Sequence, residues 1–188
     1  LSHCIEAYTN KFAHPTVDTY ALKGIELIAN NIQKACENGQ DIEARSALAL
    51  GSMYGGLCLG PVNTSAVHAL SYGLGGKFHI PHGLANAILM PEVLRFNLSA
   101  NPKRHADVAR ALGITIEGSD EEVAIAGIDK LVAISKACHI PQRLTEIGIT
   151  EDILPELADI AMNVTRLLKN NPREVTKDDA IAIYKKLL

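Results

Sequence analysis

Apolar residues recur at helical spacing along most of the chain. Between Pro15 and Gly39, for example, one helix face would carry Ala21, Leu22, Ile25, Ile28, Ala29, Ile32 and Ala35. Apolar positions three and four residues apart predict amphipathic helices, and no segment shows the alternation of a half-buried strand. Aromatic residues make up only 4% of the 188 residues, whereas strands favour aromatic and β-branched side chains. The sequence therefore predicts an all-α fold.

Capping residues, prolines and glycines divide the chain into about eight predicted helices. After a first helix around Ile5 and Tyr8, helices are expected to begin near Pro15, Asp41, Ala66, Pro81, Pro102, Ser119, Thr150 and Thr176. We expect residues 1–188 to form a single helical domain, with two packed helix groups on either side of about residue 100. The chain opens inside a helix-like pattern and without a methionine, so we expect it to be part of a longer polypeptide.

Two glycine-rich segments allow further predictions about the helices. Small and apolar residues fall on all faces of the predicted helix at 47–60, so we expect this helix to be central. Its glycines Gly51, Gly55 and Gly56 each cost about 1 kcal/mol relative to alanine, and tight helix packing is the common reason to accept that cost. The run from Gly73 to Gly76 is expected to break the next helix.

Charge and hydropathy argue against several classes of partner. The net charge is −3 and no basic run occurs, so neither nucleic acid nor an anionic membrane is expected as a partner. No apolar stretch reaches the ~20 residues of a membrane span, and we expect no signal peptide. The four cysteines lack Cys-x-x-Cys spacing and are expected to be small buried residues in a reducing compartment: Cys4, Cys36, Cys58 and Cys138. We therefore expect a cytoplasmic protein.

Three of the seven histidines, His68, His79 and His82, lie within fifteen positions. On one continuous helix, His68 and His82 would stand ~21 Å apart, too far to share a metal ion. A helix that ends, turns back and restarts brings both imidazoles together, and His3 is a candidate third ligand. The same residues also fit ordinary hydrogen-bonded positions, which is how we interpret the other three histidines: His14, His105 and His139. Spacing alone leaves both interpretations open.

Two segments that contain these histidines are informative beyond the spacing of the histidines. The longer one reads Ala66-Val-His68-Ala-Leu-Ser-Tyr72-Gly-Leu-Gly75-Gly76-Lys-Phe-His79-Ile-Pro81-His82-Gly83-Leu-Ala-Asn-Ala87, and the chain opens with Leu1-Ser-His3-Cys-Ile-Glu6-Ala-Tyr8. The first resembles the signature of the iron-containing (group III) alcohol dehydrogenases, and the second is similar to that family's Asp-x-x-x-His-x-x-Glu-x-Tyr helix. Asn171-Pro172-Arg173 resembles a tripeptide at the same place in that family. The resemblance spans the whole chain and implies the helical C-terminal domain of the dehydroquinate synthase-like architecture.

The resemblance implies a metal held by one Asp and three His. Carried over by motif, the histidines are His3, His68 and His82, and the Asp would lie four residues before His3, outside this chain. Residues i and i+4 share a helix face, so one turn presents both ligands. A carboxylate with three imidazoles suits Fe²⁺ or Zn²⁺.

The implied reaction is reversible hydride transfer between an alcohol or aldehyde substrate and a nicotinamide, with the metal as Lewis acid. NAD or NADP would bind mainly to an N-terminal domain that this chain lacks. Tyr72 is four residues past His68, in helix register with it, where some members of the family have a histidine. Its hydroxyl is expected to hydrogen-bond substrate rather than act as a base. His79 is expected to line the substrate pocket or relay protons, although a hydrogen-bonded histidine in a turn explains it equally well.

Two alternatives stand beside this hypothesis. The chain is a catalytically inactive helical module that mediates assembly, or it supports a related activity such as that of glycerol dehydrogenases or dehydroquinate synthases. Since members of the family are often dimers or larger, we also expect a homo-oligomer. We expect residues 1–188 alone to be inactive, because neither the Asp nor the nucleotide-binding domain is present.

Overall fold

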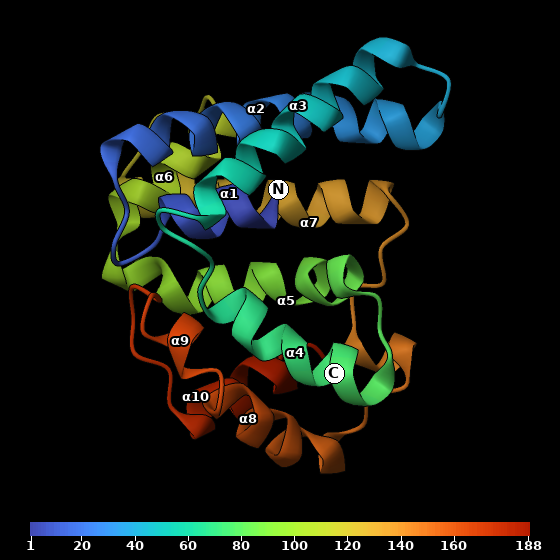
Figure 1. Cartoon of the computed structure of the whole chain (residues 1–188), viewed down its shortest axis with the longest axis vertical. Helices are drawn as coiled ribbons and strands as arrows, with labels where there is room; N and C mark the ends of the chain where they lie inside the picture. Colours follow the sequence, from blue (N-terminus) through green and yellow to red (C-terminus); the bar gives the residue numbers. More distant parts are fainter.

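Helices account for all the regular structure of the chain (Figure 1), and the computed structural model describes residues 1–188. The all-α prediction is therefore confirmed. The α-helices are α1 (Ser2–Tyr8), α2 (Pro15–Glu37), α3 (Ile42–Leu59), α4 (Ala66–Phe78), α5 (His82–Asn97), α6 (Pro102–Ala111), α7 (Asp120–Ala137), α8 (Leu154–Met162), α9 (Thr165–Leu168) and α10 (Lys177–Lys185). Three short 3-10 helices are η1 (Leu98–Ala100), η2 (Leu144–Ile147) and η3 (Glu151–Ile153). None of the helices combines the length and hydropathy that crossing a bilayer requires.

The long helix α5 crosses the middle of the molecule between two helix groups (Figure 1). One group contains α1, α2, α3, α6 and α7, and the other contains α4, α8, α9 and α10. The expected division near residue 100 is wrong, because α4 packs with the C-terminal helices while α6 and α7 pack with the N-terminal ones. The groups interleave along the chain, and α5 contacts members of both.

A continuous core of 36 buried residues joins the two groups through α5. This helix buries Ile88, Leu89, Val93 and Leu94 together with its internal proline, Pro91. Each fully buried aliphatic side chain contributes about 1.5–3 kcal/mol relative to leaving it exposed. The position of α5 is therefore fixed from several directions.

The far end of α5 is tied to the C-terminal segment by polar contacts. The buried amides of Asn97 and Asn171 exchange two hydrogen bonds, of 2.9 and 2.7 Å. Next to them, the Arg173 guanidinium lies 3.9 Å from the centre of the Phe96 ring and donates a 3.0 Å hydrogen bond to the Phe96 carbonyl. These contacts are the structural role of the Asn171-Pro172-Arg173 tripeptide.

Most predicted helix starts are confirmed by side-chain caps. Asp41 accepts a 2.9 Å hydrogen bond from the Ala44 amide, and Asn101, Ser119 and Thr176 cap α6, α7 and α10 in the same way. Thr150 makes no such bond, and the helix expected to begin near it is divided. Its two parts, α8 and α9, are separated at Asn163 and Val164.

Helix α3 departs from its prediction, since it lies on the outside rather than at the centre. Leu50, Met53 and Leu57 are 40%, 53% and 49% exposed, so its apolar composition does not reflect burial on all sides. Packing does explain two of its glycines. A Cβ at Gly51 would lie 2.7 Å from Ile28 Cγ1, and one at Gly55 would lie 3.3 Å from the His3 side chain. Gly56 has no neighbour within 4 Å.

Helix α4 also differs from its prediction, because it runs through the glycines to Phe78. The chain reverses at the next residue, His79, where φ is +55°. Gly73 lies against α8, since a Cβ there would lie 2.8 Å from Leu157 Cδ2. The reversal that brings α5 back alongside α4 therefore depends on His79, Ile80 and Pro81 rather than on the glycine run.

The cysteines follow the prediction only in part. All four are free thiols; Cys4 and Cys58 are buried, but Cys36 is exposed and Cys138 is half-buried. Cys36 is in the last turn of α2, beyond the part of that helix that the core covers. The expectation that all four are buried is therefore wrong.

Candidate metal centre

Three histidines from three different helices meet near the middle of the molecule. His3 is in the first turn of α1, His68 is in the first turn of α4 and His82 is the first residue of α5. The ring centroids of His3 and His68 are 5.0 Å apart, and those of His68 and His82 are 5.1 Å apart. The chain reversal between α4 and α5 thus brings His68 and His82 together, as the sequence predicts.

The three imidazoles open onto a cavity of about 210 Å³. Its wall is completed by residues from the start of the chain, from α3 and from α5: Leu1, Ser2, Ser52, Gly83 and Asn86. Most of these side chains are polar or small. A cavity of this volume and lining has room for an ion and a small ligand beside the rings.

Glu6 is a buried carboxylate that contacts one of the three histidines, His68. It is a charged residue with only 1% of its surface exposed, one turn along α1 from His3. One carboxylate oxygen, Oε2, contacts Nδ1 of His68. The other, Oε1, accepts hydrogen bonds from the amides of Ser65 and Val67, both at 2.9 Å, and from the Ser65 hydroxyl at 3.1 Å. Glu6 therefore both caps α4 and holds the His68 ring.

Asn86 accompanies His82 one helical turn further along α5. Its amide Nδ2 donates to the His82 carbonyl at 3.0 Å and lies 3.1 Å from His82 Nε2. Its Oδ1 is buried and has no hydrogen-bond partner. Leaving a buried amide oxygen unpaired costs free energy. Oδ1 of Asn86 is thus a free hydrogen-bond acceptor beside the candidate ligand His82.

Electrostatics at the site favour neutral imidazoles. Burial lowers the pKa of His3, and the neighbouring His68 lowers it further. Burial also lowers the pKa of His82, with a further contribution from His68. Since only neutral imidazole nitrogens bind metals, these shifts favour the ligating form.

The donor set and the ring spacing fit a metal ion, but the donor atoms do not yet converge. Bonds of about 2.0–2.1 Å in tetrahedral geometry place the centroids of two ligand imidazoles roughly 5 Å apart, which is the spacing of both ring pairs. However, no three His, Cys, Asp or Glu side chains are grouped closely enough to hold an ion as they stand. The backbone and χ1 set the ring positions, whereas rotation about the soft χ2 torsion redirects the ring nitrogens, so the donors can turn towards a shared ion without movement of the helices.

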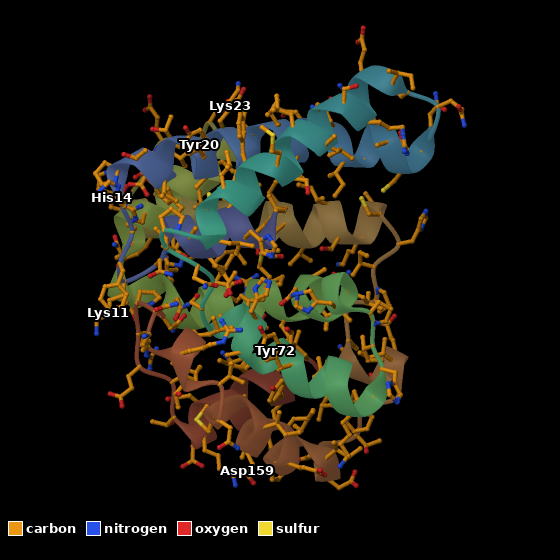
Figure 2. All side chains as sticks on the ribbon, viewed as in Figure 1. Lys11, His14, Tyr20, Lys23, Tyr72 and Asp159 are labelled. Carbon is orange, nitrogen blue, oxygen red and sulfur yellow. The ribbon has the colours of Figure 1, made fainter.

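The two other candidate site residues lie further from the cavity. The ring of Tyr72 is 6.4 Å from that of His82, and its hydroxyl accepts a 3.0 Å hydrogen bond from Arg166. Figure 2 shows Tyr72 on α4, where it is 36% exposed. His79 is exposed at the C-cap of α4 and does not line the cavity. The structure thus groups His3, His68 and His82, places Tyr72 at their edge, and leaves His79 apart.

The sequence of the whole chain matches a known family. Residues 1–188 match the model of the Fe-containing alcohol dehydrogenase family, C-terminal. The chain belongs to this family. Among its relatives, 1,3-propanediol dehydrogenase of Klebsiella pneumoniae is 37% identical over 186 residues, which are 98% of this chain and 48% of the relative. NAD-dependent methanol dehydrogenase of Bacillus methanolicus is 36% identical over 189 residues, covering 100% of this chain and 49% of that protein.

Solved structures of the iron-containing alcohol dehydrogenase family share the fold. The crystal structure of a 1,3-propanediol oxidoreductase superposes with a TM-score of 0.96 at 36% identity, over 100% of this chain and 49% of that one. The predicted helical domain of the iron-type alcohol dehydrogenase architecture is therefore confirmed. The chain spans about half the length of the relatives that it matches.

Glu6 and Asn86 are site residues to which the sequence alone assigned no role. Glu6 is part of the family-like opening segment, but its partners Ser65 and His68 are 59 and 62 positions away along the chain. A weak indication of a site role for Asn86 was its position four residues after His82, which places both residues on the same helix face.

Proposed function

We propose that this chain is the helical, metal-binding part of an NAD(P)-dependent alcohol dehydrogenase that interconverts small alcohols and aldehydes by hydride transfer. The observation that carries the proposal is the cluster of His3, His68 and His82 beside a cavity, with ring spacings that suit a shared ion. Membership of the iron-containing alcohol dehydrogenase family supports the same reaction class.

In this proposal the three histidines hold Fe²⁺ or Zn²⁺. The fourth ligand is an aspartate four positions before His3, in a longer polypeptide. When bound, the metal supplies Lewis-acid chemistry that polarises the substrate oxygen and favours the alkoxide form of an alcohol. Glu6 occupies Nδ1 of His68, so the other nitrogen of that ring is the one directed to the ion.

Tyr72 is proposed to orient the substrate. Its hydroxyl oxygen already accepts a hydrogen bond from Arg166, which leaves the hydroxyl proton free to be donated to a substrate oxygen. Of the two roles expected for His79, lining the substrate pocket does not fit its position outside the cavity, and a proton relay to solvent stays as the proposal because His79 is exposed in the turn that joins α4 to α5. Replacing His79 with Asn, which tolerates the positive φ, should slow turnover because the relay is lost; unchanged turnover across pH would remove His79 from the mechanism.

The nucleotide is proposed to bind to an additional N-terminal domain of the longer polypeptide. The relatives are about twice as long as this chain, and one of them is NAD-dependent by name. The exposed apolar side chains of α3 (Leu50, Met53 and Leu57) are consistent with a further domain that covers them. In the cell we propose a cytoplasmic homo-oligomer.

The test is metal content, measured by mass spectrometry on the full-length protein and on its His68→Ala and His82→Ala variants. We expect near-stoichiometric iron or zinc in the parent and loss of most of it in both variants, since each removes a ligand. His139→Asn serves as the control, because His139 is exposed and outside the site, and asparagine tolerates its positive φ of +58°. A parent protein that binds neither metal after incubation with Fe²⁺ or Zn²⁺ contradicts the proposal.

One observation favours a second candidate, a metal-free helical module that mediates assembly. As the side chains stand, no three of them are grouped closely enough to hold an ion. The same experiment separates the candidates, because an assembly module takes up no metal and keeps its oligomeric state when His68 is replaced. Related activities, of the glycerol dehydrogenase or dehydroquinate synthase kind, are separated by assaying a panel of alcohols and aldehydes with both nicotinamide cofactors.

A further inference from the structure

We infer that Glu6 is the positioning residue of this centre, and that it fixes His68 in the tautomer that carries its proton on Nδ1 and presents Nε2 to the cavity. The inference rests on the proposed function, because it concerns how one proposed ligand is prepared for the ion. It deepens that function by assigning a role to a residue that contacts neither substrate nor cofactor.

The two oxygens of Glu6 have separate tasks. Oε1 accepts from four donors, which are the Ser65 amide at 2.9 Å, the Ser65 hydroxyl at 3.1 Å, the Val67 amide at 2.9 Å and the His68 amide at 3.4 Å. Three of these donors are backbone amides at the start of α4, which cannot turn away. The carboxylate is therefore held in one orientation, and only Oε2 faces the imidazole of His68.

This arrangement determines where the imidazole proton lies. A carboxylate oxygen accepts hydrogen bonds and does not donate them, so Nδ1 of His68 must carry the proton that meets Oε2. In a neutral imidazole the lone pair is then on Nε2. Because His68 is one of the residues that line the cavity, its free nitrogen is ready to bind an ion without a change of tautomer.

The burial of Glu6 indicates that its carboxylate does more than cap α4. A carboxylate with 1% exposure is costly to bury unless it is fully hydrogen-bonded. Helix capping needs only one side-chain oxygen, and a serine or asparagine nearer to α4 would supply it at less cost. The second oxygen adds a negative charge and an acceptor against a ligand histidine, which orients the ring and makes it a stronger donor to a cation.

Glu6→Gln in the full-length protein separates capping from tautomer control. The amide oxygen of the introduced glutamine must stay on the α4 amides, since its NH₂ group would repel them. The NH₂ group then faces Nδ1 and donates to it, which moves the His68 proton to Nε2 and blocks the ligating nitrogen. We expect the affinity for Zn²⁺, measured by competition with a chromophoric chelator, to fall about 10–100-fold.

Ser65→Ala is the matched control. It removes one donor to Oε1 at 3.1 Å but leaves the contact between Oε2 and His68. We expect it to lower the unfolding temperature, because a hydrogen bond to a buried carboxylate is lost. Its Zn²⁺ affinity should stay within about twofold of the parent, against the 10–100-fold loss expected when a ligand histidine loses the carboxylate that orients it. Equal Zn²⁺ affinity in the parent and in folded Glu6→Gln would overturn the inference.

A second measurement needs no variant. In the metal-free protein labelled with ¹⁵N-histidine, the ring nitrogen shifts of His68 report its tautomer, and we expect the Nδ1–H form. The Nε2–H form would overturn the inference even if Glu6→Gln does not fold. If the parent itself binds neither Fe²⁺ nor Zn²⁺, the proposed function fails, whereas a parent that binds metal with His68 in the Nε2–H form defeats only the role of Glu6.

Discussion

At the scale of single residues, His105 is a buried histidine outside the site. Its side chain is 4% exposed, Nδ1 lies 2.9 Å from the Asn101 carbonyl oxygen, and Nε2 is buried without a partner. Burial lowers the pKa of His105 more than the contact with Asn101 raises it. The folded protein therefore holds His105 neutral at pH values where the unfolded chain is already protonated.

This shift predicts acid sensitivity. With the folded pKa below the unfolded value of ~6.5, the contribution of His105 to stability is complete above that pH and is lost as the pH falls towards the folded pKa. Urea unfolding at pH 7.5 and 5.5 should show a smaller pH effect in His105→Leu than in the parent. His139→Asn, at an exposed position, should keep the parental effect; equal pH effects in the parent and His105→Leu would contradict the prediction.

The sequence predicted the site residues unevenly. Their identity came from a family-like pattern, which carries His3, His68 and His82 into the cluster that the structure shows. The contacts that prepare them could not be predicted, because Glu6 meets α4 across about sixty residues of chain and its carboxyl orientation depends on amides at the start of α4. A pattern of residue types does not contain that orientation.

At the scale of helices, local signals succeeded where a side chain interacts with its own backbone. Asp41, Ser119 and Thr176 each cap the helix that follows, as predicted. The predictions that failed concern the effect of the glycines in α4 and the burial of the apolar helix α3. Both depend on residues that are distant in the sequence. Gly73 was expected to break α4, yet the space that it leaves is filled by Leu157 from α8.

Helix packing also predicts opposite effects for two glycines. A Cβ at Gly127 in α7 would lie 2.3 Å from Ala109 Cβ and 2.8 Å from its Cα on α6, whereas a Cβ at Gly56 would meet nothing within 4 Å. We expect Gly127→Ala to lower the free energy of unfolding by about 1–3 kcal/mol through overpacking. Gly56→Ala should raise it by about 1 kcal/mol through helix propensity. Urea titrations of both variants test this, and a Gly127→Ala variant as stable as Gly56→Ala would show that α6 and α7 separate without cost.

At the scale of the whole molecule, the interleaved groups explain why the expected division failed. Helices α6 and α7 follow α5 in the chain but return to α2, while the later helices cover α4. Periodicity identifies the buried face of each helix but not its partner, so the sequence could predict the fold class and most of the elements but not their grouping.

The proposed division of labour predicts an inactive isolated chain. Residues 1–188 expressed alone should fold, since their core contains 36 buried residues, yet they should show no turnover of alcohols or aldehydes with NAD(H) or NADP(H). The reason is that hydride transfer needs a bound nicotinamide, which we propose the N-terminal domain supplies. Circular dichroism provides the control for folding, and measurable turnover by the folded fragment would contradict the proposal.

Helix α5 carries His82 at its first residue, while the amide pair of Asn97 and Asn171 secures its last one. The two ends are ~24 Å apart along the helix axis. A change in the Asn171-Pro172-Arg173 segment would therefore loosen the proposed ligand His82, which this segment does not touch. On the proposed function, a genetic screen for lost activity would recover Asn171 variants alongside His82 variants. Cooling would separate the two classes, because a variant with a loosened helix α5 would bind metal again at low temperature, whereas a variant without the proposed ligand would not.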